Sequence, residues 1–167
     1  MQICPLPLCG AMAYSAPMPD LTPQLDAAAA QCARQGATLT ELRRAVLELI
    51  LAARGPLTAY QLLDQLKATR KSAVPPTVYR ALDFLAENRL IHRIERLNAF
   101  IPCAETGHAH EDAQFLICRS CGAVTEMDDH EVSHALAAAA ARHGFRPAHA
   151  IVELDGVCAA CAARAAT

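Results

Sequence analysis

The chain of 167 residues contains eight cysteines, and four of them form two Cys-x-x-Cys pairs. The pairs are Cys118 with Cys121 and Cys158 with Cys161. Two thiolates at this spacing can hold one side of a tetrahedral ion, so two pairs together complete a closed four-cysteine zinc site. In a cytosolic chain disulfides are disfavoured, and paired motifs of this kind indicate metal. The sequence therefore predicts a structural zinc held by all four thiolates.

One redox motif beside an accidental pair is the alternative explanation of these cysteines. A thioredoxin-type motif is expected at a turn from a strand into a helix, whereas the stretch 118–122 lies between two strand-like runs. The two pairs are separated by residues 122–157, a spacer longer than that of a simple zinc ribbon, so we expect a folded unit between them. Cys4, Cys9 and Cys32 follow no partner pattern and are given no role.

The elements that precede these cysteines are predicted to be helices followed by a hairpin. A first helix is expected over 23–35, a second after a Thr38-x-x-Glu41 capping box, a third capped by Thr58, and a fourth from Pro75-Pro76 to about Asn88. Two alternating runs, 90–95 and 99–103, then predict a β-hairpin. Helices followed by a hairpin in this order are typical of a winged helix-turn-helix.

The fourth helix carries residues suited to reading DNA. Its first turns hold Thr77, Tyr79 and Arg80, and recognition helices present their early residues to base edges in the major groove. Arginine can bridge the two acceptors of guanine, and tyrosine offers a ring for thymine methyl groups. Tyr60, at the start of the preceding helix, is placed to bind a phosphate. The alternative for each is ordinary: a partly buried tyrosine and a solvated surface charge.

Charge is distributed unevenly along the chain, although the formal net charge is only −2. Residues 1–33 carry −2, residues 34–102 carry +5, and residues 103–167 carry −5. The positive charge of residues 34–102 favours contact with a polyanion. Charged side chains that gathered by chance on solvent-exposed faces would give the same net charges.

The second half is predicted to be a small α/β unit. Strands are expected over 114–117, 123–127 and 150–154, with an alanine-rich helix over 130–143 and a short helix over 158–166. A hinge between the halves is expected near 103–108. The fold class is therefore α+β, with residues 1–22 as a disordered extension, 23–103 as the winged helix and 104–167 as a metal-binding and dimerisation domain.

Three motifs in this order resemble the ferric uptake regulator family. The run 75–85, Pro-Pro-Thr-Val-Tyr-Arg-Ala-Leu-Asp-Phe-Leu, resembles the family's recognition helix, and the two Cys-x-x-Cys blocks match its structural zinc site. The resemblance covers about residues 32–162, and its nearest branch is the zinc uptake regulators. It implies a homodimer whose C-terminal domains dimerise, and which represses transcription when metal is bound.

The resemblance also implies a second, regulatory zinc site. The branch takes a histidine after the recognition helix, a cysteine at the end of the wing, a histidine in the next loop and a glutamate after the first Cys-x-x-Cys. The matching residues are His92, Cys103, His110 and Glu126, with His108 as the alternate third ligand. Zn²⁺ accepts nitrogen, sulfur and oxygen ligands, whereas a thiolate disfavours Mn²⁺ and is unusual for Fe²⁺ sensing.

The expected function is therefore a zinc-responsive repressor with about two Zn²⁺ per subunit, acting as a homodimer on palindromic operators of zinc-uptake genes. An iron, manganese or peroxide sensor of the same family is the nearest alternative, and it would sense metal without Cys103. A structural or metal-trafficking zinc protein is the alternative outside DNA binding, and it would not need the residues that open the fourth helix.

Several classes of protein are not expected. No run of about 18 apolar residues predicts a membrane span, and the prolines within the first 20 residues argue against a signal peptide, so a cytoplasmic protein is predicted. An enzyme is not predicted, because a catalytic zinc keeps a position open for water and no nucleophile–base arrangement is visible. No small-molecule substrate is expected.

Overall fold

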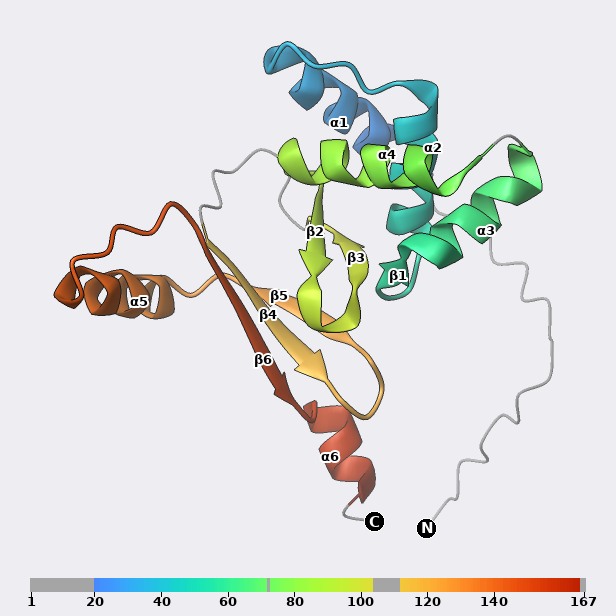
Figure 1. Ribbon diagram of the computed structural model, residues 1–167. Coiled ribbons are helices and arrows are strands. Elements are labelled where there is room, and N and C mark those ends of the chain that lie inside the picture. The colour runs from blue at the N-terminus through green and yellow to red at the C-terminus, as the bar shows by residue number, and fades with distance from the viewer. Residues whose placement is uncertain (1–19, 72, 104–111, 166–167) are drawn as a thin grey trace.

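The computed structural model describes residues 20–71, 73–103 and 112–165, and contains two groups of elements (Figure 1). The first group has helices α1 (Thr22–Arg34), α2 (Glu41–Ala52), α3 (Ala59–Thr69) and α4 (Pro75–Glu87) above a small sheet. That sheet contains β1 (Leu57–Thr58), β2 (Ile91–Ile94) and β3 (Ala99–Pro102) in the antiparallel order β1-β3-β2. We call β2, β3 and the 3₁₀ turn η1 (Glu95–Leu97) between them the wing.

The local sequence explains where these helices begin. Thr58 caps α3, because its hydroxyl accepts from the backbone N–H of Gln61 while the Gln61 side chain accepts from the backbone N–H of Thr58. The capping box predicted at Thr38 is wrong, since α2 begins at Glu41 and Thr40 occupies the N-cap position. The Thr38 carbonyl instead accepts from Arg43 Nη1 at 2.7 Å.

One hydrophobic core joins the four helices to the wing. Leu62, Leu82 and Leu85 are fully buried at the centre of this core, where α3 meets α4. Gln31 of α1 is also buried, and its side-chain amide donates to the carbonyl of Asn88, which ends α4. Helix α4, the predicted DNA-reading helix, is therefore held at its sides by apolar packing and at its C-terminal end by a buried hydrogen bond.

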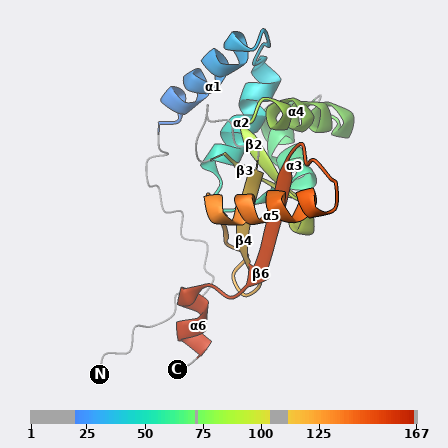
Figure 2. The same cartoon turned by 90° about the vertical axis from the view of Figure 1, so that its left-hand side faces the viewer.

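The second group is a three-stranded sheet with two helices. It contains β4 (Asp112–Cys118), β5 (Val124–Met127) and β6 (Ala150–Gly156) in the order β5-β4-β6, which we call the second sheet. Helix α5 (His130–Arg142) connects β5 to β6, and α6 (Ala159–Ala165) follows β6. Figure 1 shows α5 standing off to one side of this sheet, and both views show α6 beyond its end (Figure 2).

The predicted fold class, α+β with a winged helix-turn-helix before a small α/β unit, is confirmed. The sequence did not reveal β1, which consists of two residues directly before α3. Residues 1–19 of the predicted extension lie outside the described residues, and α1 already begins at Thr22. Within the described residues, no helix combines the length and apolar character needed to cross a bilayer.

Candidate metal centres and nucleic-acid interface

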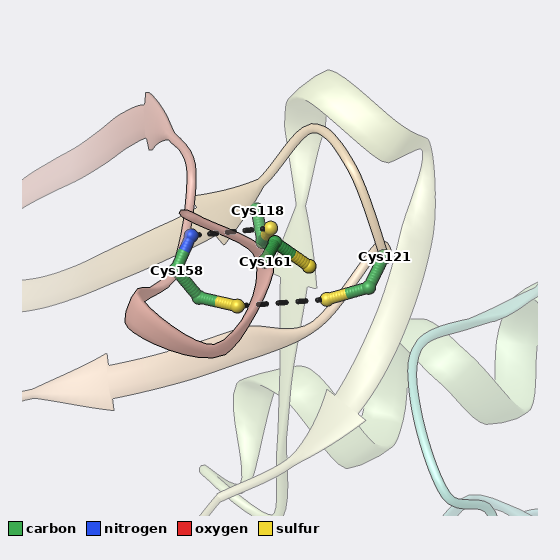
Figure 3. A group of neighbouring side chains, drawn as sticks. All are labelled: Cys118, Cys121, Cys158 and Cys161. Atoms are coloured by element: carbon green, nitrogen blue, oxygen red, sulfur yellow. Dashed lines mark hydrogen bonds between the residues drawn. The ribbon is translucent and has the colours of Figure 1, made fainter. Parts of the chain in front are cut away.

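The two Cys-x-x-Cys pairs converge at one end of the second sheet (Figure 3). Cys118 ends β4, Cys121 lies in the turn before β5, and Cys158 and Cys161 lie at the start of α6. Their four sulfur atoms all lie within 4.8 Å of one another, and the Cys121 and Cys158 sulfurs are 3.9 Å apart. A tetrahedron with Zn–S bonds of about 2.3 Å has an edge of about 3.8 Å. The thiols are therefore spaced as a tetrathiolate zinc site requires.

The backbone around this cluster favours thiolates. The backbone N–H of Cys158 donates to the Cys118 sulfur at 3.3 Å, and together with that of Cys121 it lowers the pKa of Cys118 to about 6. In the metal-free chain the neighbouring Cys158 sulfur and burial raise the pKa of Cys161 to about 12. A bound divalent cation favours deprotonation of all four, because a thiol coordinates as its thiolate. Gly122, with φ of +72°, allows the turn that carries Cys121.

A second cluster joins the wing to the second sheet. His92 lies on β2, Cys103 directly follows β3, and Glu126 lies on β5. One ligand atom of each lies within 4.8 Å of the other two. His92 Nε2 is 3.1 Å from a Glu126 carboxylate oxygen but has no hydrogen-bond partner among the described residues. A buried nitrogen aimed at a carboxylate without hydrogen-bond geometry fits a shared cation between them.

The electrostatics of this cluster agree with its chemistry. Burial lowers the pKa of His92, but the Cys103 sulfur and the Glu126 carboxylate outweigh it and raise that pKa to about 9. Without metal, His92 therefore carries a proton beside a carboxylate, and a metal ion must displace that proton to use the nitrogen. A nitrogen, a sulfur and an oxygen ligand together suit Zn²⁺, with one position of a tetrahedron still to be filled.

The predicted third ligand lies outside the described residues, as does its alternate. His110 and His108 both belong to the segment 104–111, which connects Cys103 to β4. The segment has one end at Cys103, itself a member of the cluster. Coordination of zinc by His110, with His108 as the alternate, stays a prediction.

Phe115 is a member of this site that sequence reasoning did not identify. It is fully buried on β4, and its ring centroid lies 5.3 Å from that of His92. Its partner residue across the β4–β5 pairing is Glu126, so the two side chains lie on the same face of the second sheet. Phe115 therefore packs against the His92 ring and helps to fix its orientation. The sequence predicted a strand over 114–117, but a predicted strand does not say which of its side chains contacts the wing.

The predicted DNA-contacting residues lie at the start of α3 and α4. Tyr60 and Tyr79 are 68% and 41% exposed, and Arg80 is also exposed, so the side chains of all three are accessible to a ligand. Thr77 differs, because its hydroxyl donates to the Val74 carbonyl at 2.6 Å and accepts from the Val74 N–H. Thr77 therefore has a local role in starting α4, whatever it contacts in DNA.

Comparison with known proteins places these features in a family. The sequence model of the ferric uptake regulator family matches residues 34–155. The zinc uptake regulation protein of Escherichia coli (strain K12) is 39% identical over 130 residues, which cover 78% of this chain and 76% of that protein. That of Mycobacterium tuberculosis (strain H37Rv) is 32% identical over 129 residues, covering 75% and 95%. A solved zinc uptake regulator complexed with zinc and DNA is 36% identical, with a TM-score of 0.84, covering 89% of this chain and 99% of that one.

Proposed function

Because this chain belongs to the ferric uptake regulator family, on the branch of the zinc uptake regulation proteins, we propose that it is a zinc-responsive transcriptional repressor. The zinc-loaded homodimer binds palindromic operators and represses genes for zinc uptake. Zn²⁺ is held at two sites in each subunit, one structural and one regulatory. The observation that carries the proposal is the cluster of His92, Cys103 and Glu126, because it joins the wing to the second sheet.

The geometry of that cluster explains how metal controls DNA binding. His92 and Cys103 belong to the same group of elements as the recognition helix, whereas Glu126 belongs to the second sheet, which we assign to dimerisation. His92, Cys103 and Glu126 would hold a Zn²⁺ together only when the wing lies on the second sheet, so metal binding would favour that arrangement. The distance between the two recognition helices of a dimer must match the half-site spacing of a palindrome. Ligands shared between the two groups of elements therefore link metal occupancy to that distance.

The second sheet offers an apolar face for a second copy of the chain. Leu116 of β4 and Leu154 of β6 are paired in register and are 42% and 50% exposed, with Val157 51% exposed just beyond them. Together with Cys118 and Ala159 they line a shallow hollow of about 400 Å³. Exposed apolar side chains in one patch indicate a protein–protein contact, and the homodimer of this family is the partner that fits it.

The proposal includes no enzymatic reaction. Four cysteines at the structural site, and His92, Cys103 and Glu126 together with His110 at the regulatory site, leave no open position for water or substrate. The site of action is the cytoplasm, because a repressor must reach the chromosome. The thiolate of Cys103 distinguishes this zinc site from the nitrogen and oxygen sites expected of an iron or manganese sensor.

A DNA-binding titration against buffered free Zn²⁺ tests the proposed function, with the metal content of the protein measured at the lowest and the highest zinc concentration. DNA affinity should rise as the second Zn²⁺ per subunit binds, and Mn²⁺ or Fe²⁺ at the same free concentration should not replace it. Operator binding that is independent of zinc, or that follows Fe²⁺ or Mn²⁺ instead, would contradict the proposal.

Replacing Arg80 with alanine should weaken operator binding by about 1–3 kcal/mol and relax the base preference, because a bidentate arginine–guanine contact is lost. Tyr60→Phe should instead weaken all duplexes alike, because a phosphate contact carries no base information. Affinities for the operator and for a scrambled duplex in excess zinc measure both effects. Arg142→Ala on α5 removes the same charge from the other half and should leave both affinities unchanged. Normal operator binding by Arg80→Ala would show that α4 is not the reading helix.

A further inference from the structure

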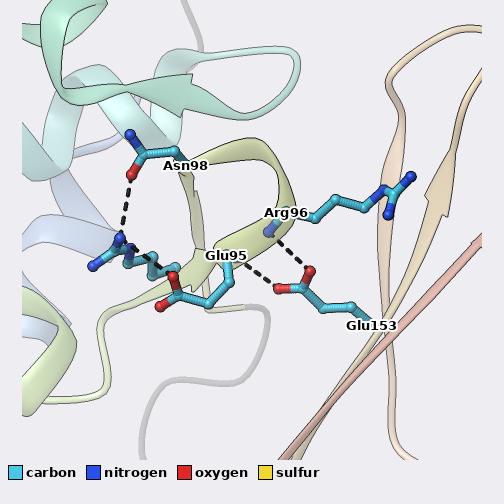
Figure 4. Close-up of polar contacts among 5 residues, drawn as sticks. Glu95, Arg96, Asn98 and Glu153 are labelled. Carbon is cyan, nitrogen blue, oxygen red and sulfur yellow. Dashed lines mark hydrogen bonds and ion pairs between the residues drawn. The ribbon is translucent and has the colours of Figure 1, made fainter.

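A second contact holds the wing on the second sheet, and it contains no metal ligand (Figure 4). The Glu153 carboxylate of β6 accepts from the backbone N–H of Glu95 at 2.6 Å and from that of Arg96 at 3.0 Å. These two N–H groups open the 3₁₀ turn at the tip of the wing, where no preceding carbonyl of the turn is available to them. One carboxylate therefore satisfies two backbone donors of the wing with its two oxygens.

Strand register aligns this contact with the metal cluster. Phe115 of β4 pairs with Glu126 of β5 on one side and with Glu153 of β6 on the other. Residues in register share one face of a sheet, so Glu126, Phe115 and Glu153 form a single row across the second sheet. Glu126 faces His92, Phe115 packs on the His92 ring, and Glu153 binds the wing tip. The row therefore meets the wing at three points, of which only one is a metal ligand.

The neighbouring ion pairs add less to this contact. Asp155 lies 3.0 Å from Arg96 Nη2 and 3.5 Å from Arg119 Nε, but both arginine side chains are more than half exposed. Solvent and salt screen such pairs, and each contributes little. Hydrogen bonds from backbone N–H groups to a carboxylate are stronger, since the acceptor is charged and the donors are already fixed by the turn. Glu153 is therefore the principal polar contact at the wing tip.

We propose that Glu153 is a positioning residue that holds the wing on the second sheet without metal, and that it thereby sets how much zinc the protein needs. The proposal rests on the proposed function. A ligand that binds only one arrangement has an apparent affinity reduced by the fraction of protein in that arrangement. Glu153 raises this fraction, so its loss lowers the apparent zinc affinity of the regulatory site. Excess zinc restores the arrangement, so DNA affinity at saturation stays the same.

The test is the zinc titration of operator binding with the full chain carrying Glu153→Ala. We expect the free Zn²⁺ at half-maximal binding to rise about tenfold, with DNA affinity at saturating zinc within about twofold of the unchanged protein. Glu153→Gln should shift the midpoint by less, because its one carbonyl oxygen can still accept from one of the two N–H groups. Glu131→Gln, an exposed position on α5, makes the same change in charge and should not move the midpoint.

Hydrogen–deuterium exchange of the protein that holds only its structural zinc tests the contact without DNA and without metal at the regulatory site. Exchange within residues 94–98 should be faster in Glu153→Ala than in the unchanged chain, while α5 exchanges alike in both. Unchanged exchange at the wing tip, or an unmoved zinc midpoint in a protein whose unchanged form responds to zinc, would overturn the role of Glu153. Failure of the unchanged protein to respond to zinc would overturn the proposed function instead, and the exchange comparison would still decide the contact.

Discussion

Replacing Cys118 or Cys161 with serine should unfold the second half of the chain and abolish dimerisation. The described part of that half, residues 112–165, buries very little: Phe115 and Ile117 are its only large buried apolar side chains, and α5 has no buried residue. Such a core cannot offset the conformational entropy of more than fifty residues. Metal ligation and the dimer contact must therefore supply the missing stability.

The magnitudes support a large effect. A structural zinc contributes on the order of 10–16 kcal/mol of apparent binding free energy, which is comparable to or larger than the whole stability of a typical domain, about 5–15 kcal/mol. Loss of one thiolate leaves three ligands around an ion that prefers four. Structural zinc bound to the closed cluster is thus expected to be a condition of folding for this half.

Sedimentation and zinc content measure the result. Either serine variant should be monomeric, should have lost structural zinc, and should show reduced circular dichroism from α5 and the second sheet. Cys32→Ala is the matched control, because Cys32 is buried in α1 and belongs to neither cluster. It should lower thermal stability while keeping zinc content and dimerisation. A Cys118→Ser or Cys161→Ser protein that stays dimeric with full zinc content would disprove the structural role.

Most of the fold could be predicted from local sequence, because its elements follow from short-range rules. Prolines predicted the start of α4 at residue 75, Gly144 marked the end of α5, and the runs 114–117 and 150–154 predicted β4 and β6. Where two local rules compete, prediction was poorer. Thr38 and Thr58 are both followed three residues later by Glu or Gln, but only Thr58 forms the capping box. Gln61 is the third residue of its helix, whereas Glu41 is the first residue of α2 and Thr40 is its N-cap.

The site could be predicted only as far as residue types reveal it. Cysteine pairs and scattered histidines indicate metal by their chemistry, and resemblance to the family selected His92, Cys103 and Glu126 among them. Phe115 and Glu153 have no such chemical signature. Their roles depend on the register of β4 between β5 and β6, which is a long-range property that neither periodicity nor spacing contains. Contacts between the wing and the second sheet are therefore the part that required the structure.

Replacing Cys103 with serine should give a folded dimer that keeps its structural zinc and shows no zinc-dependent operator binding. Cys103 is buried, follows β3 directly, and is bonded through its backbone N–H to the Leu90 carbonyl, a contact that serine preserves. The change therefore removes a sulfur without disturbing either core. A hydroxyl is a poor replacement for a thiolate at Zn²⁺, so the three remaining ligands should bind it far more weakly.

The third ligand can be assigned with the same measurement. His110→Ala should behave like Cys103→Ser, whereas His108→Ala should respond to zinc almost as the unchanged chain does. The reverse result would exchange the two histidines and leave the mechanism as proposed.

Zinc stoichiometry separates loss of the regulatory site from general damage. Cys103→Ser should bind one Zn²⁺ per subunit rather than two, should sediment as a dimer, and should bind the operator weakly at every zinc concentration. Cys32→Ser removes a buried thiol from the same half and should retain both the second zinc and the response. A Cys103→Ser protein that still binds DNA with the normal zinc dependence would refute the ligand set. It would also remove the thiolate argument for zinc as the signal, because the site would then resemble the nitrogen and oxygen sites of the iron and manganese sensors.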